Sequence, residues 1–234
     1  MKEIKKETND KNIVVTEEAL SRSEQFIERN LKIIIGVITA IVLLIAVILI
    51  YTRFILGPQQ QEAMAEMFMA ERYFEQDSLR LALEGDGTHL GFLDIISEYR
   101  MTRSANLARY YAGISHLWLG EYEEAIRHLK RFRGGDQMIT ALAYGAIGDA
   151  YLQLEDNPKA LKHYAKAYKH EPNQFTTPMF LMKAARVHEL EQNYAEAIKL
   201  YEKIRTDYPA SNEARNIERY IARAETLLGN TSGN

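Results

Sequence analysis

The chain has 234 residues, of which 26% are charged and 10% aromatic, an ordinary composition for a folded protein. Its formal net charge of −3 excludes the strongly basic surface that is typical of nucleic-acid-binding proteins. The absence of cysteine excludes disulfides and cysteine-ligated metal sites.

Residues 1–31 form a short polar tail of mixed charge. Residues 15–27 have the spacing of a short amphipathic helix with Thr16 as N-cap, and a flexible tail is the alternative.

Residues 33–52 are twenty consecutive residues without a charge. A helix of that length rises about 30 Å, the thickness of the hydrocarbon core of a bilayer. A buried core helix would need a polar face, and a cleaved signal peptide would need a shorter apolar run and a small-residue cleavage site. The pattern therefore predicts an uncleaved transmembrane signal anchor over residues 32–56.

Lysine and arginine residues predict the orientation of this anchor. The first 32 residues hold seven of them, and the 21 residues from Arg53 to Tyr73 hold two. Because the more positive flank stays in the cytoplasm, we expect a cytoplasmic N-terminus and a translocated C-terminal part.

Residues 57–104 are expected to form a linker and a degenerate first repeat. The pair Gly57-Pro58 predicts a helix break, and apolar residues then recur at helical spacing over residues 59–84. A glycine-rich turn and a shorter helix over residues 92–99 follow.

The most informative pattern is a phrase of small residues that occurs three times in residues 105–209. Ala125, Ala160 and Ala197 are 35 and 37 residues apart, and a second small residue keeps the same steps. Such a period predicts an array of helix–turn–helix units. Six small side chains are expected where the two helices of each unit cross: Gly113, Ala125, Gly148, Ala160, Ala185 and Ala197.

The middle unit resembles the tetratricopeptide (TPR) repeat nearly residue for residue, through Gly148, Tyr151, Ala160, Tyr164, Ala167 and Pro172. The resemblance implies an all-α fold: one transmembrane helix, a TPR-type helix–turn–helix solenoid of three repeats over 105–209, and a C-terminal capping helix. Residues 210–234 are expected to hold this capping helix, over 212–228, and a disordered end.

The whole layout resembles the ancillary subunit of the bacterial Sec translocon, the YfgM-like family. This resemblance implies a single-pass protein of the bacterial inner membrane, with a periplasmic TPR domain that meets translocon subunits, periplasmic chaperones or secreted clients. The alternative is an assembly subunit of another envelope complex, for division, wall synthesis or outer-membrane export. An organelle import receptor with a cytosolic TPR domain is opposed by the charge asymmetry.

TPR geometry implies which side chains face a protein-binding groove. Trp118, the only tryptophan, is the candidate anchor, since Trp, Tyr and Arg are favoured in binding hot spots, and packing against a neighbouring helix is the alternative. The groove candidates are Leu107, Tyr110, Ile114, Leu117, Trp118, Leu142, Asp149, Leu152, Gln153, Met179, Met182, Arg186, Glu189 and Leu190.

The sequence contains no recognisable catalytic or phosphate-binding motif. The histidines are scattered, and His163 and His170 are two helical turns apart, too far to share a metal ion. We therefore expect a protein that is not an enzyme and has no cofactor, metal or nucleic-acid partner. Its expected partners are proteins, and membrane lipid around residues 33–52.

Overall fold

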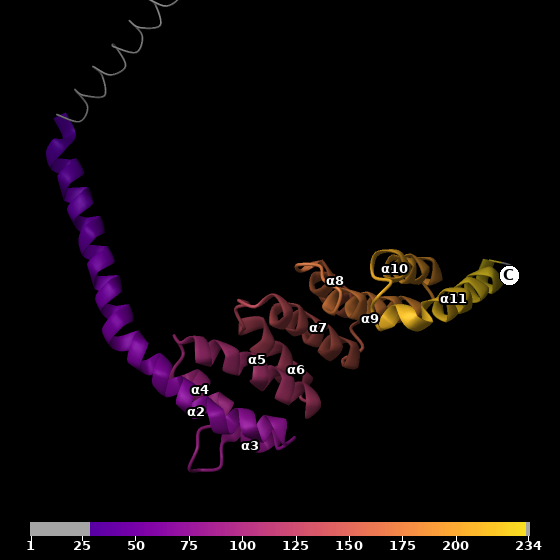
Figure 1. Ribbon diagram of the computed structural model, residues 1–234, viewed down its shortest axis with the longest axis horizontal. Coiled ribbons are helices and arrows are strands. Elements are labelled where there is room, and N and C mark those ends of the chain that lie inside the picture. The colour runs from indigo at the N-terminus through magenta and orange to yellow at the C-terminus, as the bar shows by residue number, and fades with distance from the viewer. Residues whose placement is uncertain (1–28, 233–234) are drawn as a thin grey trace, which may run out of the picture. The chain divides into compact units, whose positions relative to one another are not determined.

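The computed structural model describes residues 29–232, so the predicted tail helix over 15–27 lies outside the described residues. The chain divides into two units between Pro58 and Gln59, and Figure 1 shows the described residues of both. All regular structure in residues 29–232 is helical, as the sequence predicts.

The apolar stretch lies in a helix that is described from Arg29 to Glu75, which by length and composition is able to cross a membrane. The predicted break at Gly57-Pro58 is wrong, because helix α2 runs over Gly57–Glu75. A π-helical turn, Thr52–Leu56, precedes it, and the Gly57 N–H donates to the Thr52 carbonyl. This wider turn accommodates Pro58, which has no amide proton to give.

The second unit begins with a packed group of helices: α2, α3 (Leu79–Glu84) and α4 (Phe92–Glu98). The sequence predicts one helical stretch over 59–84, but Asp77 has a left-handed φ of 55° and separates α2 from α3. Buried Met67, Leu83 and Phe92 join the three helices in one apolar core.

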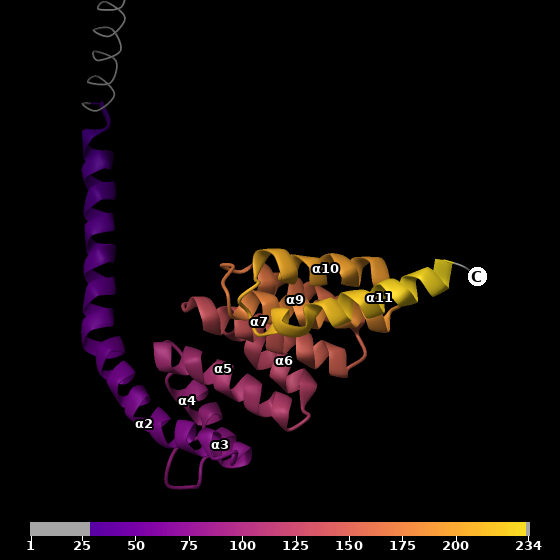
Figure 2. The same cartoon turned by 45° about the vertical axis from the view of Figure 1, so that its right-hand side comes forward.

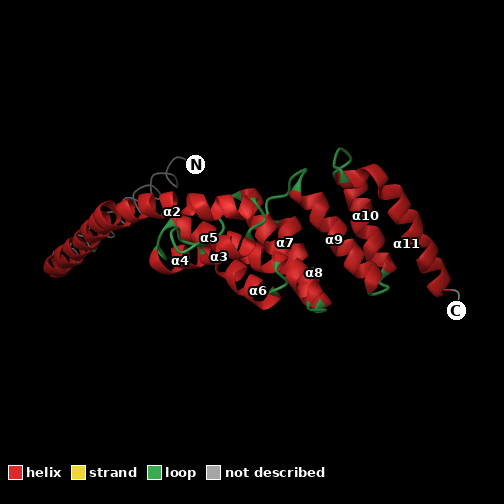
Figure 3. Ribbon diagram, turned by 90° about the horizontal axis from the view of Figure 1, so that it is seen from below, coloured by secondary structure: helices red, strands yellow, loops and turns green. Residues whose placement is uncertain are grey.

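Three helix pairs follow in chain order, lying side by side in a row (Figures 2 and 3). Repeat one is α5 (Arg103–Trp118) with α6 (Tyr122–Arg131), repeat two is α7 (Gln137–Gln153) with α8 (Asn157–Lys169), and repeat three is α9 (Thr176–Leu190) with α10 (Tyr194–Asp207).

The helices of a pair approach closely because small residues lie where they cross. A Cβ atom added to Gly148 would lie 2.6 Å from the Tyr164 ring, and one added to Gly113 would lie 2.4 Å from Leu129. Neither distance is compatible with a side chain larger than hydrogen unless the neighbour moves. All six of the small residues named from the sequence pattern are buried: Gly113, Ala125, Gly148, Ala160, Ala185 and Ala197.

The turn inside each pair repeats one backbone conformation. Gly120, Glu155 and Gln192 occupy equivalent positions in the three repeats, and their φ angles are 78°, 58° and 59°. A left-handed residue is a common way to end a helix, so the same corner is built three times.

A short 3₁₀ turn, Glu213–Asn216, leads to α11 (Ile217–Ser232). Its buried Ile217, Ile221 and Ala224 pack against α10 and cover the apolar end of repeat three. The sequence predicts a disordered end from Gly229, but α11 runs on to Ser232. Residues 233–234 lie outside the described residues.

Candidate functional site

The inner helices of successive repeats line a pocket of about 850 Å³. Four of the predicted groove residues meet there: Leu152 from α7, and Arg186, Glu189 and Leu190 from α9. The capping helix α11 completes the wall, with Tyr194 from α10 at its edge. We call this the C-terminal groove; its lining is Leu152, Arg186, Glu189, Leu190, Tyr194, Arg219, Tyr220, Arg223 and Leu227.

Positive charge gathers around one aromatic ring in the C-terminal groove. The guanidinium groups of Arg186, Arg219 and Arg223 lie 5.6, 5.3 and 5.7 Å from the centre of the Tyr220 ring. Hydrogen bonds, first from Arg186 and then from Arg219, lower the pKa of the Tyr220 hydroxyl. Glu189 pairs with Arg223 and is the one carboxylate in the lining. The groove therefore carries an excess of positive charge.

The same groove also offers apolar surface. Leu190 at the end of α9 is 70% exposed, and Leu152 of α7 is half-buried. Exposed leucine beside arginine and tyrosine suits a segment that carries both apolar and acidic side chains.

The groove candidates on α5 lie elsewhere and are of mixed accessibility. Trp118 is 58% exposed and also stacks on Phe74, with ring centres 5.1 Å apart, so it has both the exposure of an anchor and a packing role. Ile114 is buried, and the Tyr110 ring packs against Phe132. Leu107 and Leu117 are half-buried.

The remaining groove candidates also differ in their accessibility to solvent. Met182 is buried, Leu142 and Met179 are half-buried, and Gln153 is exposed. Asp149 is held inside the array, because it accepts hydrogen bonds from the Tyr164 hydroxyl and the Lys183 ammonium, each at 2.7 Å. Asp149 therefore serves the packing of repeats two and three.

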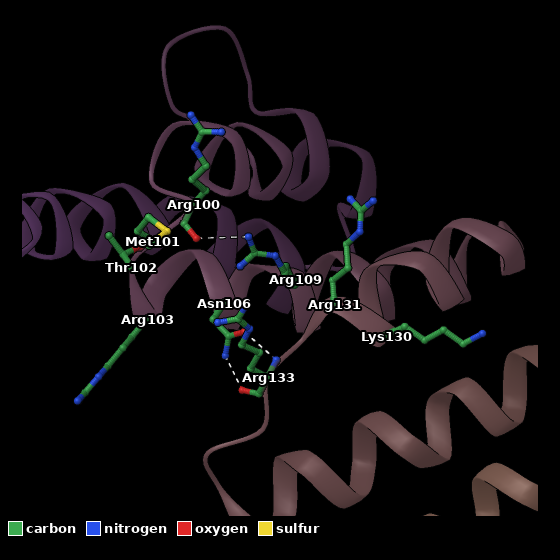
Figure 4. A pocket seen from close by; sticks show the side chains of 9 residues that line it. All are labelled: Arg100, Met101, Thr102, Arg103, Asn106, Arg109, Lys130, Arg131 and Arg133. Atoms are coloured by element: carbon green, nitrogen blue, oxygen red, sulfur yellow. Dashed lines mark hydrogen bonds between the residues drawn. The ribbon is translucent and has the colours of Figure 1, made fainter.

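A second pocket, of about 620 Å³, lies between the turn before α5 and the end of α6 (Figure 4). We call it the cationic pocket. Six of its nine lining residues are basic, and none of these six has a carboxylate within 4.0 Å among residues 29–232: Arg100, Arg103, Arg109, Lys130, Arg131 and Arg133.

The cationic pocket is held together by uncharged acceptors. The Asn106 side chain bonds the Arg133 backbone in both directions, at 2.7 and 2.8 Å, and Arg109 donates to the Arg100 carbonyl (Figure 4). Burial, and then the nearby Arg133 and Arg131, lower the pKa of the Arg109 guanidinium. A carboxylate or phosphate group would relieve this repulsion.

Two histidines that are scattered in the sequence meet in repeat one. His116 of α5 and His128 of α6 have stacked rings with centres 5.2 Å apart, and Glu124 lies beside them. The spacing of histidines along one helix does not reveal this cluster, because its two rings come from different helices. Arg219, Tyr220 and Arg223 were not predicted either, and their signal in the sequence is a basic and aromatic face on the capping helix.

Comparison with known proteins agrees with the helix pairs. Family models of the tetratricopeptide repeat match residues 107–134 and 146–212. Superkiller complex protein 3 of Mus musculus is 29% identical over 133 residues, which cover 56% of this chain and 8% of that protein. The chain thus spans less than a tenth of that relative's length.

These matches support a tetratricopeptide-repeat protein. Arrays of this kind present extended concave surfaces to other proteins and are generally not enzymes. Repeats of this class suggest a protein–protein interaction adaptor.

Proposed function

We propose that this chain is a membrane-tethered TPR adaptor that binds other proteins through its C-terminal groove. The apolar helix, with lysine and arginine concentrated before it, supports the tether and a cytoplasmic N-terminus. A tether raises the effective concentration of the groove near the membrane, so that a weak binding surface is sufficient.

The C-terminal groove carries the proposal. Three arginines around Tyr220 and the exposed Leu190 favour a partner segment that combines acidic and apolar side chains. The separate cationic pocket carries the same charge preference, although the chain as a whole is acidic.

The layout of tail, anchor and short TPR array supports a place at the periplasmic face of the bacterial inner membrane. There the chain would serve the Sec translocon, periplasmic chaperones or secreted clients. The second candidate is an assembly subunit of another envelope complex, for division, wall synthesis or outer-membrane export. The same anchor and groove would serve it.

Site-specific photocrosslinking in whole membranes tests the groove. A photoreactive amino acid at Leu190, which is 70% exposed, should crosslink a partner. The matched control is Lys199 on the outer helix α10, whose side chain is 68% exposed but lies outside the groove. Equal crosslinking from both positions, or crosslinks only from Lys199, would place the binding surface elsewhere.

Charge variants sharpen this test, and mass spectrometry of the crosslinked product separates the two candidate complexes. The double variant Arg219→Gln/Arg223→Gln should lose the Leu190 crosslink and keep the helical content. Lys199→Gln/Arg205→Gln, which removes the same charge from α10, should keep the crosslink.

A reporter fusion tests the tether. Alkaline phosphatase fused after Asn234 should be active, because the array is translocated in this proposal. Activity only from a cytoplasmic reporter, or a mature N-terminus near Gly57, would contradict the uncleaved anchor.

A further inference from the structure

Repeat one contains two buried imidazole nitrogens without a partner. His116 and His128 are each 7% exposed, and their Nε2 atoms have no hydrogen-bond partner. Unpaired buried polar atoms are uncommon in folded proteins, because each one loses its hydration without compensation. Among the described residues, His163 and His188 also have an unpartnered imidazole nitrogen, but only the rings of His116 and His128 face each other, so that one ligand would satisfy both nitrogens.

The His116 ring is oriented by a neighbouring carboxylate. Its Nδ1 lies 2.6 Å from the Oε2 atom of Glu121. Because the carboxylate accepts, Nδ1 donates, and in the neutral ring this leaves the lone pair on Nε2. Metal-binding histidines are commonly oriented by a carboxylate on the other ring nitrogen in this way.

A third donor lies one helical turn before His128. Glu124 is on α6, and one ligand atom each from His116, Glu124 and His128 lie within 4.8 Å of one another. The Glu124 side chain is 43% exposed, so the cluster is open to solvent on one side and closed by the helix pair on the other.

We propose that His116, Glu124 and His128 bind a divalent transition-metal ion, for which Zn²⁺ is the fitting species. Two imidazole nitrogens and one carboxylate oxygen are ligands that zinc accepts, and water takes the fourth, solvent-facing position. Glu121 is a positioning residue that acts through His116. The ion would join the two helices of repeat one.

The repeat register shows that this set of side chains is specific to repeat one. The positions of His116, Glu121, Glu124 and His128 are occupied in repeat two by Tyr151, Asp156, Lys159 and His163. In repeat three they are occupied by His188, Asn193, Glu196 and Leu200. Among the three repeats, only repeat one combines two facing imidazoles with a carboxylate.

Two arginines form ion pairs with the carboxylates of this cluster. Arg127 pairs with Glu124 from the same helix, and Arg80 of α3 pairs with Glu121. Binding of the ion at Glu124 would displace Arg127, while the Arg80 pair is able to remain. Replacing Arg127 by glutamine should therefore tighten binding.

Titration of the full chain in detergent with Zn²⁺ tests the proposal, with a tag that contains no histidine. Calorimetry should show one ion per chain, and Co²⁺ should give the visible absorption of a tetrahedral nitrogen–oxygen site. Glu124→Gln and His128→Gln should each weaken Zn²⁺ binding tenfold or more, and Glu121→Gln by about 10 to 100-fold.

His163→Gln is the matched control, because His163 is an equally buried histidine at the equivalent position of repeat two. It should bind Zn²⁺ like the unaltered chain. If His128→Gln does not fold, Glu124→Gln decides, because its side chain is partly exposed. Zn²⁺ affinity unchanged in Glu124→Gln, or lost equally in His163→Gln, would overturn the site.

Discussion

Repeats one and two share a backbone arrangement but differ in what fills it. Gly113 and Ala125 in repeat one match Gly148 and Ala160 in repeat two, and all four are buried. Beside these residues, repeat two places the Tyr164 ring, whose hydroxyl donates to Asp149 at 2.7 Å. Repeat one places Leu129 at that position.

The difference teaches that small residues set the helix crossing, whereas the large side chains are free to vary. Where repeat two has Tyr151 against His163, repeat one has His116 against His128. The same backbone arrangement thus accepts two aromatic pairs of different chemistry, tyrosine with histidine or histidine with histidine.

The largest loss of stability is expected from a charge placed at a helix crossing, and it tests whether the crossings of the two repeats are equivalent. Ala160→Glu and Ala125→Glu each place a carboxylate at a fully buried crossing. Each should destabilise the protein by about 3 to 5 kcal/mol, because the charge has no partner there. Thermal or denaturant unfolding measures this, and Glu123→Ala on the exposed face of α6 is the control. A large effect in one repeat only would show that the two crossings are not equivalent.

Acid should act through the buried histidine of repeat two. Burial first, and then nearby Lys166, Lys130 and Lys162, lower the pKa of His163 from 6.5 to about 4. The unfolded chain therefore binds the extra proton between these values. The free energy of unfolding therefore has its full value from this group above about pH 6.5. It falls by on the order of 2 to 3 kcal/mol as the pH is lowered toward 4.

Urea unfolding at several pH values, with a chelator present, measures this loss. His163→Gln should reduce the dependence of the unfolding free energy on pH between 6.5 and 4, and the remainder includes His128, whose pKa is also lowered to about 4, chiefly by burial. An unchanged slope would mean that His163 is protonated in the folded chain.

The glycines at the two crossings should differ in tolerance. Gly148→Ala should cost about 2 kcal/mol, because the added Cβ meets the Tyr164 ring at 2.6 Å and Asp149 holds that ring. Gly113→Ala should cost about 1 kcal/mol, because Leu129 is more flexible. Gly135 has nothing within 4 Å of an added Cβ, so Gly135→Ala is the control for the unfolding measurements. Equal costs would mean that the Tyr164 ring yields as easily as Leu129.

The hydroxyl that distinguishes repeat two should contribute less. Tyr164→Phe removes its hydrogen bond to Asp149, while Lys183 keeps both of its contacts with that carboxylate. The expected cost is about 1.5 kcal/mol, measured by denaturant unfolding, since the acceptor is charged. A change below about 0.5 kcal/mol would indicate that water replaces the hydroxyl.

The all-helical fold was predictable because small residues recur in the sequence at the positions where helices cross. The division of α2 from α3 was not, since Asp77 adopts a left-handed conformation without being glycine. The binding surfaces were harder still. Tyr220 and the pair His116 and His128 gain their neighbours only when separate helices pack, which spacing along one helix does not report.

The left-handed corner inside each repeat has a consequence for engineering the array. Repeat one uses Gly120 there, whereas repeats two and three use Glu155 and Gln192 in a conformation that costs L-residues about 1 kcal/mol or more. Introducing glycine would relieve this strain but would also loosen the unfolded chain, so Glu155→Gly or Gln192→Gly should gain about 0.5 kcal/mol. Because the turn has the same backbone conformation in all three repeats, the turn residue of one repeat can be transferred to another without changing the helices on either side.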